Sequence, residues 1–315
     1  MRNLTLRQLR SIQAISRLGT IAAAARQLGL TAPAVTLQVK QVEDDVGLAL
    51  FDRTSDGMRL TVAGTAVLAA ANAIETTLRG LAGEIDSIKG VRSGTIHLGV
   101  VSTAKYFAPR LIASFREAYP QIEVKLKIGN RHAIIADLKD YKLDVALMGR
   151  PPIEFPIEAT FFGDHPLVII ADPAHPLVRE REIGRDRLLA ETIIIREPGS
   201  GTRTALEGFF AEHPDRLAAR SVEMGSNETI KQAVMAGLGI AFISAHTIAF
   251  EVEMGRIAVL DVADMPIRRK WYAVCRKERM AAPAEKAFKR FLVERGAQHL
   301  PLLDQLYPAA AVDAG

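Results

Sequence analysis

The first fifty residues predict three short helices, because the same pattern occurs there three times. A threonine, whose side chain can accept hydrogen bonds from the unpaired N–H groups of a helix start, precedes an amphipathic segment. A glycine, which readily adopts the left-handed conformation that ends a helix, follows it. The three segments run from Thr5 to Gly19, from Thr20 to Gly29 and from Thr31 to Gly47.

The second and third of these helices are joined by a short turn, residues 28–31, which contains a glycine. Two helices connected in this way form a helix-turn-helix, here over about residues 21–40, and this motif commonly binds DNA. After it, two short segments flank the polar turn 54–57 and predict a hairpin the size of a wing. Residues 1–61 are therefore predicted to form a winged helix-turn-helix domain.

A single long helix is predicted over residues 62–92, as a linker. Its apolar side chains recur every 3.5 residues on average, which is typical of a seam between two helices. The alternative is a lone helix that packs on its own domain, but the spacing favours pairing with a second copy of the chain. The predicted dimerisation residues are Val67, Ala71, Ile74, Leu78, Leu81, Ile85 and Ile88.

From Thr95 the pattern changes to alternating strands and helices, which predicts an α/β domain with largely parallel sheets. Its length and the proline and glycine break at 162–166 favour two lobes. A helix at 284–295 follows, and the Pro- and Ala-rich tail 297–315 is expected to be disordered. The predicted strands are 96–101, 122–128, 144–148, 167–171, 192–195, 221–224, 239–244 and 271–276.

Composition narrows the possible locations and partners. The net charge of +4 is compatible with nucleic acid as a partner but does not establish it, since the basic residues are spread over both ends. No run of 18 apolar residues indicates a membrane span, and no apolar signal sequence is present. The single cysteine, Cys275, lies in a predicted strand and is interpreted as a structural thiol. A cytoplasmic protein is expected.

An enzyme and a transport-type solute-binding protein are the competing classes. The segment Gly199-Ser200-Gly201 is not a nucleophile elbow, and no histidine is placed to complete a triad. No catalytic set, metal site or cofactor is expected. The predicted helical head and the lack of a signal sequence argue against a solute-binding protein.

Three helices of the α/β domain are predicted to begin where a strand ends, after Val101, Glu197 and Gly225. Helix N-termini favour anions, and open α/β sheets bind ligands at strand C-termini. Small polar residues and nearby cations at these starts indicate a small effector that is phosphorylated or otherwise anionic. The predicted effector-binding residues are Ser102, Thr103, Lys105, Arg150, Arg196, Ser200, Gly201, Thr202, Arg203, Ser226 and Asn227.

Several motifs resemble the LysR-type transcriptional regulators. In the head they are AAARQL at 23–28, PAVT at 33–36, VKQVE at 39–43, LFDR at 50–53 and LTVAG at 60–64. Three sensor stretches are similar to the Calvin-cycle, or RuBisCO operon, regulators of the CbbR group. These are LMGRPP at 147–152, REPGSGTRT at 196–204 and EMGSNETIKQAVMAG at 223–237.

The resemblance implies a fold and a function. The fold class is α/β, with an N-terminal all-α winged helix-turn-helix, a linker helix and a two-lobed sensor like periplasmic binding proteins. Ser102, Thr103 and Thr202 fall on effector positions of the family. The implied function is activation of carbon-fixation genes by a dimer of dimers on double-stranded DNA, with RNA polymerase as a further partner. The alternative is a regulator of another operon. The implied boundaries are 93–163 with 267–296 for lobe 1 and 164–266 for lobe 2.

The third helix is expected to enter the major groove and the wing to contact phosphates. Many relatives have a polar residue where Ala32 stands and a basic one where Leu37 stands. Few hydrogen bonds from this helix to base edges are therefore expected. Contacts with thymine methyl groups and DNA shape should then contribute more. The predicted DNA-binding residues are Thr31, Ala32, Pro33, Thr36, Leu37, Lys40, Arg53, Arg59 and Thr61.

Overall fold

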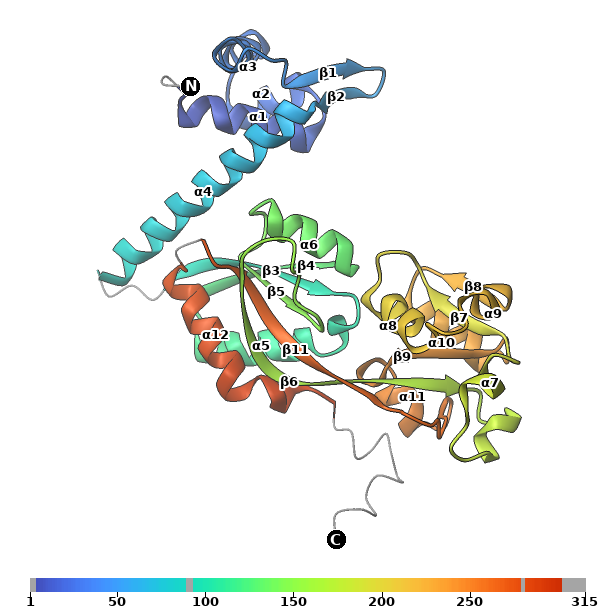
Figure 1. The fold of residues 1–315 in the computed structure, drawn as a ribbon. Helices are drawn as coiled ribbons and strands as arrows, with labels where there is room; N and C mark the ends of the chain where they lie inside the picture. Colours follow the sequence, from blue (N-terminus) through green and yellow to red (C-terminus); the bar gives the residue numbers. More distant parts are fainter. Residues whose placement is uncertain (1–3, 89–92, 279–280, 302–315) are drawn as a thin grey trace. The chain divides into compact units, whose positions relative to one another are not determined.

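The computed structural model describes residues 4–88, 93–278 and 281–301 (Figure 1). The three predicted head helices are present, and each ends at a glycine with a positive φ. Each is also capped by the threonine before it, so the pattern of the sequence is confirmed. The helices are α1 (Leu6–Leu18), α2 (Ile21–Leu28) and α3 (Ala32–Val46).

The wing is a two-stranded antiparallel sheet of β1 (Phe51–Thr54) and β2 (Gly57–Leu60). Two hydrogen bonds donated by backbone N–H groups hold the hairpin and the residue before it to the helices. Met58 N–H donates to Gly19 O at 2.8 Å, and Leu50 N–H donates to Glu43 Oε1, also at 2.8 Å. The buried side chains of the three helices and of Leu50 form one apolar core beneath the hairpin.

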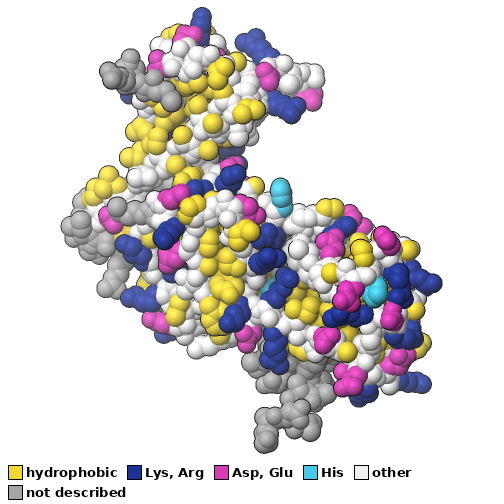
Figure 2. Space-filling model, in the orientation of Figure 1, with side chains coloured by type: hydrophobic (Ala, Val, Ile, Leu, Met, Phe, Trp, Pro, Cys, Tyr) yellow, Lys and Arg dark blue, Asp and Glu magenta, His cyan; other side chains and the backbone are white. Residues whose placement is uncertain are grey.

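One continuous helix, α4 (Val62–Ile88), follows the wing, as predicted. Along its seam, Ala71 is buried, whereas Ile74, Leu81 and Ile85 are 38%, 53% and 42% exposed. Figure 2 shows hydrophobic side chains gathered along this part of the molecule. The side chain of Ile88 lies outside the described part. Among the described helices, including α4, none is both long enough and apolar enough to cross a membrane.

The sensor is built on a nine-stranded sheet with the order β4-β3-β5-β11-β6-β9-β7-β8, and β10 pairs with β6. The sheet is mixed, so the prediction of largely parallel sheets was wrong. β3 is parallel to β4 and β5, and β7 is parallel to β8 and β9, but every pair that includes β6 or β11 is antiparallel. The strands are β3 (Gly94–Val101), β4 (Ile122–Gly129), β5 (Val145–Met148), β6 (Ile157–Ala171), β7 (Ile193–Arg196), β8 (Ser221–Met224), β9 (Ile240–Ser244), β10 (Ala258–Val259) and β11 (Ile267–Arg276).

Helices connect these strands, mostly where the sequence predicted them. The helix expected directly after Val101 is an exception, because a short 3-10 turn comes first. The helices are η1 (Ala104–Tyr106), α5 (Ala108–Ala118), α6 (Arg131–Lys139), η2 (Pro176–Arg179), α7 (Arg185–Leu188), α8 (Gly201–Phe209), α9 (Pro214–Ala219), α10 (Asn227–Met235), η3 (Ala245–Thr247), α11 (Ala249–Glu253), α12 (Pro283–Arg295) and η4 (Gly296–His299).

Two long strands, β6 and β11, run side by side through both lobes. β6 continues unbroken through Pro166, so the break predicted at 162–166 was wrong, although Phe162 and Leu167 belong to two different apolar cores. Proline is tolerated because β6 pairs with β9 only from Leu167 onward, so no donor is needed on that side. A Cβ at Gly163 would overlap Cδ1 of Leu300, the end of a flexible side chain, which would have to shift.

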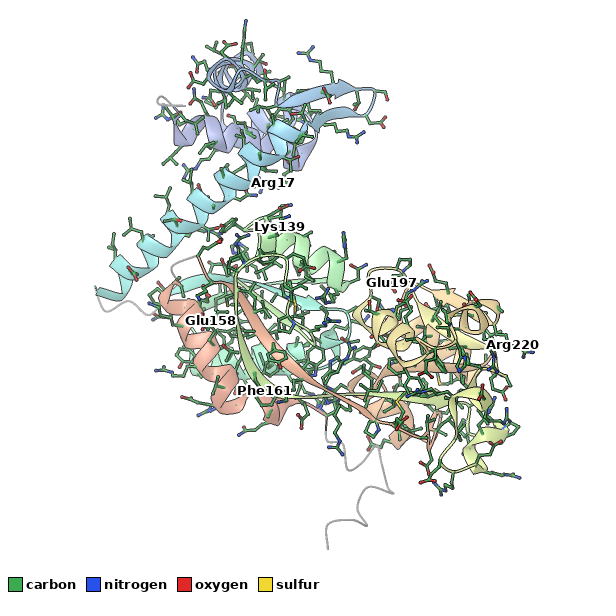
Figure 3. The ribbon with its side chains drawn as sticks, viewed as in Figure 1. Arg17, Lys139, Glu158, Phe161, Glu197 and Arg220 are labelled. Carbon is green, nitrogen blue, oxygen red and sulfur yellow. The ribbon has the colours of Figure 1, made fainter. Side chains whose placement is uncertain are left out.

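Each lobe has its own core. The core of lobe 1 includes Trp271 and Cys275, which is 2% exposed, and α12 packs against it. Lobe 2 buries one apolar cluster around Phe210 and a second around Ile230. In Figure 3, the labelled Glu158 and Phe161 lie on the lobe 1 part of β6, and Glu197 and Arg220 lie in lobe 2. The described chain continues past residue 296 through η4, and Leu300 packs on lobe 1. Residues 302–315 of the expected tail lie outside the described residues.

Candidate DNA-binding surface and effector pocket

The start of α3 has one buried side and one exposed side. Buried Val35 and Val39 anchor the helix in the core, and the residues predicted to meet DNA lie on its other side. Leu37 is 56% exposed. The exposed set comprises Thr31, Ala32, Pro33, Thr36, Leu37 and Lys40.

The threonine hydroxyls of this region are engaged within the head. Thr31 Oγ1 accepts from Ala34 N–H, which leaves its own hydrogen available to a phosphate. Thr61 Oγ1 donates to Ala49 O at 2.7 Å and accepts from Gly64 N–H at 3.0 Å. The Thr61 hydroxyl hydrogen is therefore used at the junction between the wing and α4, and contact of Thr61 with DNA stays a prediction.

Both wing arginines are exposed, but they lie on opposite faces of the hairpin. Arg59 is paired across the strands with Asp52, and Arg53 is paired with Met58. Side chains of directly opposed residues share a face, and neighbours along a strand alternate. Both cationic and acidic side chains are present around the wing in Figure 2. The two guanidinium groups therefore lie on different sides of the hairpin.

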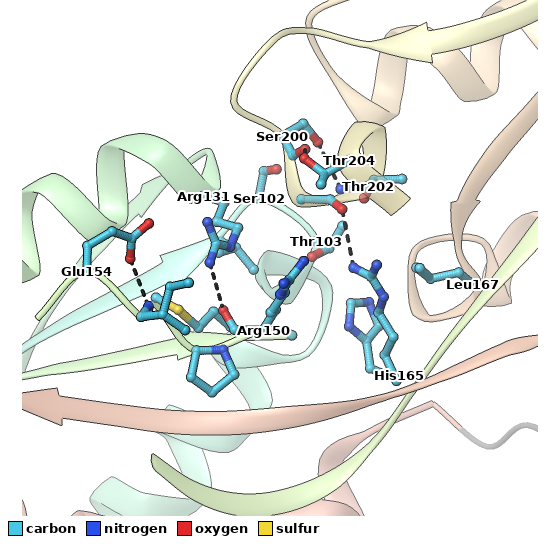
Figure 4. Close-up of a pocket in the computed structure, with 17 residues that line it drawn as sticks. Ser102, Thr103, Arg131, Arg150, Glu154, His165, Leu167, Ser200, Thr202 and Thr204 are labelled. Atoms are coloured by element: carbon cyan, nitrogen blue, oxygen red, sulfur yellow. Dashed lines mark hydrogen bonds between the residues drawn. The ribbon is translucent and has the colours of Figure 1, made fainter. Parts of the chain in front are cut away.

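A cavity of about 230 Å³ lies between the two lobes (Figure 4). Lobe 1 contributes the end of β3 and the segment after β5, and lobe 2 contributes the start of α8. Six of the predicted effector residues line it, and they come from three separate parts of the sequence. They are Ser102, Thr103, Arg150, Ser200, Gly201 and Thr202.

Five predicted effector residues do not line the cavity. Lys105 Nζ is 2.7 Å from Glu228 Oε2, across the two lobes. Arg196 is buried and bonds Glu197 at 2.7 Å. Their charges are therefore balanced by carboxylates, and a sequence read without tertiary contacts could not identify those partners.

Of the other three, Arg203 bonds Glu207 and Glu223, at 2.9 and 2.6 Å. Asn227 Oδ1 accepts from Arg196, and Ser226 caps α10. The start of α10 thus contributes to a bonded network rather than to the lining of the cavity.

Two cations of the pocket were missed in the sequence. Arg131 begins α6, and Arg269 lies on β11, two residues before the start of the predicted strand 271–276. Arg131 Nη2 donates to Arg150 O at 3.3 Å, and Arg269 Nη1 donates to Gly201 O at 3.4 Å. No local pattern distinguishes these arginines from surface ones.

The pocket is strongly cationic. Three arginines, Arg131, Arg150 and Arg269, line it with a single carboxylate, Glu154. Burial lowers the pKa of Arg269, and repulsion from Arg150 and Arg131 lowers it further. Burial also lowers the pKa of Arg131, against the opposing effect of Glu154. Like charges held together in a partly buried site favour an anionic ligand.

The helix start on the lobe 2 side adds to this preference. Ser200 caps α8, its hydroxyl accepting from Thr202 N–H at 3.3 Å. The first N–H groups of a helix and its dipole favour negative charge. Thr202 and Thr204 also line the cavity, so hydroxyl groups lie beside the cations.

A buried histidine forms part of the same wall. The ring of His165 stacks on Trp271 at 3.9 Å between centroids, and its Nε2 lies 3.0 Å from Ser244 Oγ. Burial holds the pKa of His165 well below its ordinary value, and His246 and Arg269 lower it further. The positive charge of the pocket at neutral pH therefore comes from the arginines and not from His165.

Two family models match the chain. Residues 6–65 match the bacterial regulatory helix-turn-helix protein, lysR family, and residues 89–297 match the LysR substrate binding domain. The chain belongs to the LysR family of transcriptional regulators. The similarity that we identified in the sequence is thereby confirmed, and the enzyme alternative is set aside, since the family and the named relatives are transcription regulators.

Individual members of the LysR family are similar over nearly the whole chain. HTH-type transcriptional regulator CbbR of Rhizobium meliloti (strain 1021) is 56% identical, with 99% of each chain covered. The RuBisCO operon transcriptional regulator of Allochromatium vinosum is 42% identical, over 94% of this chain and 98% of its own.

Solved structures of the LysR family agree with the fold. The Synechocystis PCC6803 CcmR regulatory domain in complex with 2-PG is 36% identical, with a TM-score of 0.60, and covers 64% of this chain and 97% of its own. Full-length CbnR complexed with its target DNA is 22% identical, with a TM-score of 0.64 over 93% and 100% of the two chains, and supports the fold alone.

Proposed function

We propose that this LysR-family regulator controls carbon-fixation genes in response to a small phosphorylated metabolite that binds between the sensor lobes. The gene class is supported by the similarity to CbbR and to RuBisCO operon regulators. The ligand class is supported chiefly by one observation, the convergence of Arg131, Arg150 and Arg269 on one cavity.

The charge balance of the pocket suits a ligand with two negative charges. Three guanidinium groups and one carboxylate leave an excess of two positive charges on the lining. Guanidinium groups bind phosphate and carboxylate oxygens with paired N–H donors. The cavity volume restricts the ligand to a small molecule, and 2-PG is bound by the related CcmR regulatory domain.

In the head, the start of α3 would contact the bases and the wing would contact the phosphates. Dimers would form through α4, where Ile74, Leu81 and Ile85 are exposed in the single chain. Pairing of the dimers, contact with RNA polymerase and the lobe boundaries at 163/164 and 266/267 belong to the same proposal.

Calorimetric titration with 2-PG, sugar monophosphates and sulfate tests the ligand class. We expect the full-length protein to bind at least one phosphate monoester and to be stabilised against heat by an amount that rises with the logarithm of the ligand concentration. Arg131→Gln should lose most of that affinity, whereas Arg181→Gln, which changes an exposed lobe 2 arginine, should retain it. Binding of none of these anions would refute the ligand class.

Genomic footprinting tests the gene class independently. The expected result is occupancy upstream of carbon-fixation genes. Occupancy only beside unrelated operons would refute the carbon-fixation role and leave the LysR-family assignment intact.

A further inference from the structure

The first two turns of α3 present hydrocarbon where a helix in the major groove commonly presents hydrogen-bonding groups. Ala32 and Pro33 are exposed, and Leu37 is 56% exposed although it belongs to a helix with a well-formed buried side. A large exposed leucine has a free-energy cost in water that is recovered only when another apolar surface covers it.

Several polar side chains of the same helix already have hydrogen-bond partners within the head. Thr36 Oγ1 donates to Ala32 O at 2.9 Å, so its hydrogen is used by the helix itself. The acceptor oxygen of Gln38 is bonded by Ser11, and that of Gln41 by Gln8 at 3.0 Å. Glu43 accepts from Leu50 N–H at 2.8 Å.

Lys40 is the cation of this helix, and it lies a full turn beyond the exposed apolar residues. An ammonium group on a flexible stem is a point charge, suited to phosphate more than to paired readout of a base edge. The hydrogen-bonding capacity directed at base edges by α3 is therefore small.

We propose that α3 selects its DNA site mainly through van der Waals contact between Leu37, with Ala32 beside the helix start, and the 5-methyl groups of thymine. In the major groove the thymine methyl is the apolar feature that distinguishes this base from the others. The inference rests on the helix-turn-helix as the DNA-binding domain, and it specifies which chemical group of the partner that domain reads.

The test uses the full-length protein and duplexes recovered by repeated selection from a random-sequence pool. Thymines of the protected half-sites are replaced by deoxyuridine, which keeps base pairing and removes only the methyl group. Burying one methyl corresponds to about fourfold in affinity, so two contacted thymines should give a loss of roughly fifteenfold. Replacement by 5-bromodeoxyuridine, whose bromine has nearly the size of a methyl group, should restore binding.

Duplexes with 7-deazaguanine or 7-deazaadenine remove the purine N7 acceptor in the same half-sites and should change affinity less than twofold. Equal affinity for thymine and deoxyuridine duplexes, or a large loss with the deazapurines, would overturn the inference while DNA binding itself remained established. Failure to recover any salt-sensitive DNA site would remove both the inference and the DNA-binding assignment on which it depends.

Leu37→Ala supplies the matching protein variant. It should bind the thymine duplex about as weakly as the wild type binds the deoxyuridine duplex, and its affinity should no longer depend on the methyl group. Leu48→Ala is the control, because Leu48 is 60% exposed in the same head but lies beyond the end of α3. Persistent sensitivity to deoxyuridine in Leu37→Ala would assign the readout to another residue and refute the role of Leu37.

Discussion

The exposed side of α3 in the head and the wall of the sensor pocket differ in where their polar groups lie. On α3, the Thr36 hydroxyl and the Gln38 carbonyl already have hydrogen-bond partners within the head, and hydrocarbon is exposed, as at Leu37. In the pocket, hydroxyl and guanidinium groups line the cavity, and Arg131 and Arg269 are partly buried there. Covering apolar surface would therefore favour binding at the head, and neutralising charge would favour binding in the pocket.

This difference determines which conditions should affect each region. Contacts between buried cations and an anion act over short distances at low dielectric constant and are only weakly screened by salt. Contacts between exposed wing arginines and a DNA backbone are strongly screened by salt. The head also contains no histidine in residues 1–61, whereas His165 and His246 are buried in the sensor.

The largest expected effect concerns the charge of the pocket. Arg269→Gln should weaken binding of the anionic effector about 100-fold, because it removes a partly buried partner of the ligand's charge. The same change relieves repulsion with Arg150 and Arg131, so the empty protein should melt at an equal or higher temperature. Calorimetry and thermal melting measure the two effects. Weaker ligand binding together with a lower melting temperature would indicate a folding defect instead.

Acidification should destabilise the sensor specifically. Burial lowers the pKa of His246 to about 4, below its unfolded value near 6.5. The unfolded chain therefore binds the proton first, and this contribution to stability is present above pH 6.5 and is lost as the pH falls toward 4. Between pH 7.5 and pH 5 the loss should be about 2 kcal/mol for this group.

Denaturant unfolding followed by Trp271 fluorescence measures that loss, since Trp271 is the only tryptophan and lies in the sensor core. His246→Gln should show a smaller decrease in stability over the same pH range. Equal decreases in the two proteins would show that other groups, chiefly carboxylates, account for the acid sensitivity.

The wing should give a smaller effect that depends on salt. Arg53→Ala should weaken DNA binding severalfold for all sequences alike and reduce the slope of log affinity against log salt by about 0.9. Fluorescence anisotropy at several salt concentrations measures both quantities. An unchanged slope would show that Arg53 contacts no phosphate. Because Arg59 lies on the opposite face of the hairpin, the double variant should show additive losses.

The smallest expected change is in effector affinity when the head and the linker helix are removed. A chain that begins at residue 93 should bind the effector within about twofold of the full-length affinity, since every residue that lines the cavity lies beyond position 100. DNA binding should be lost. A large loss of effector affinity would show that the two functions are coupled more tightly than separate sites imply.

The sequence predicted the head well because its structure depends on local chemistry. Capping by Thr20 and Thr31 and chain reversal at Gly29 and Gly47 act within a few residues, so the bounds of α2 and α3 agree with those predicted. The exposed positions of α3 follow from the helical period once Val35 and Val39 are assigned to the core. In the sensor, Ser200 and Thr202 were found for the same reason, as residues of a helix start.

Only the tertiary structure decided the remaining features of the sensor. The mixed sheet depends on the pairing of β6 with β11, about one hundred residues apart, and no local pattern encodes such a register. The tertiary structure also decides which arginines can bind a ligand. Arg196 and Arg203 have carboxylate partners, whereas Arg131 and Arg269 line the cavity. An arginine has the same local preferences in either setting. Its role depends on the charges that folding brings near it, and these come from distant parts of the chain.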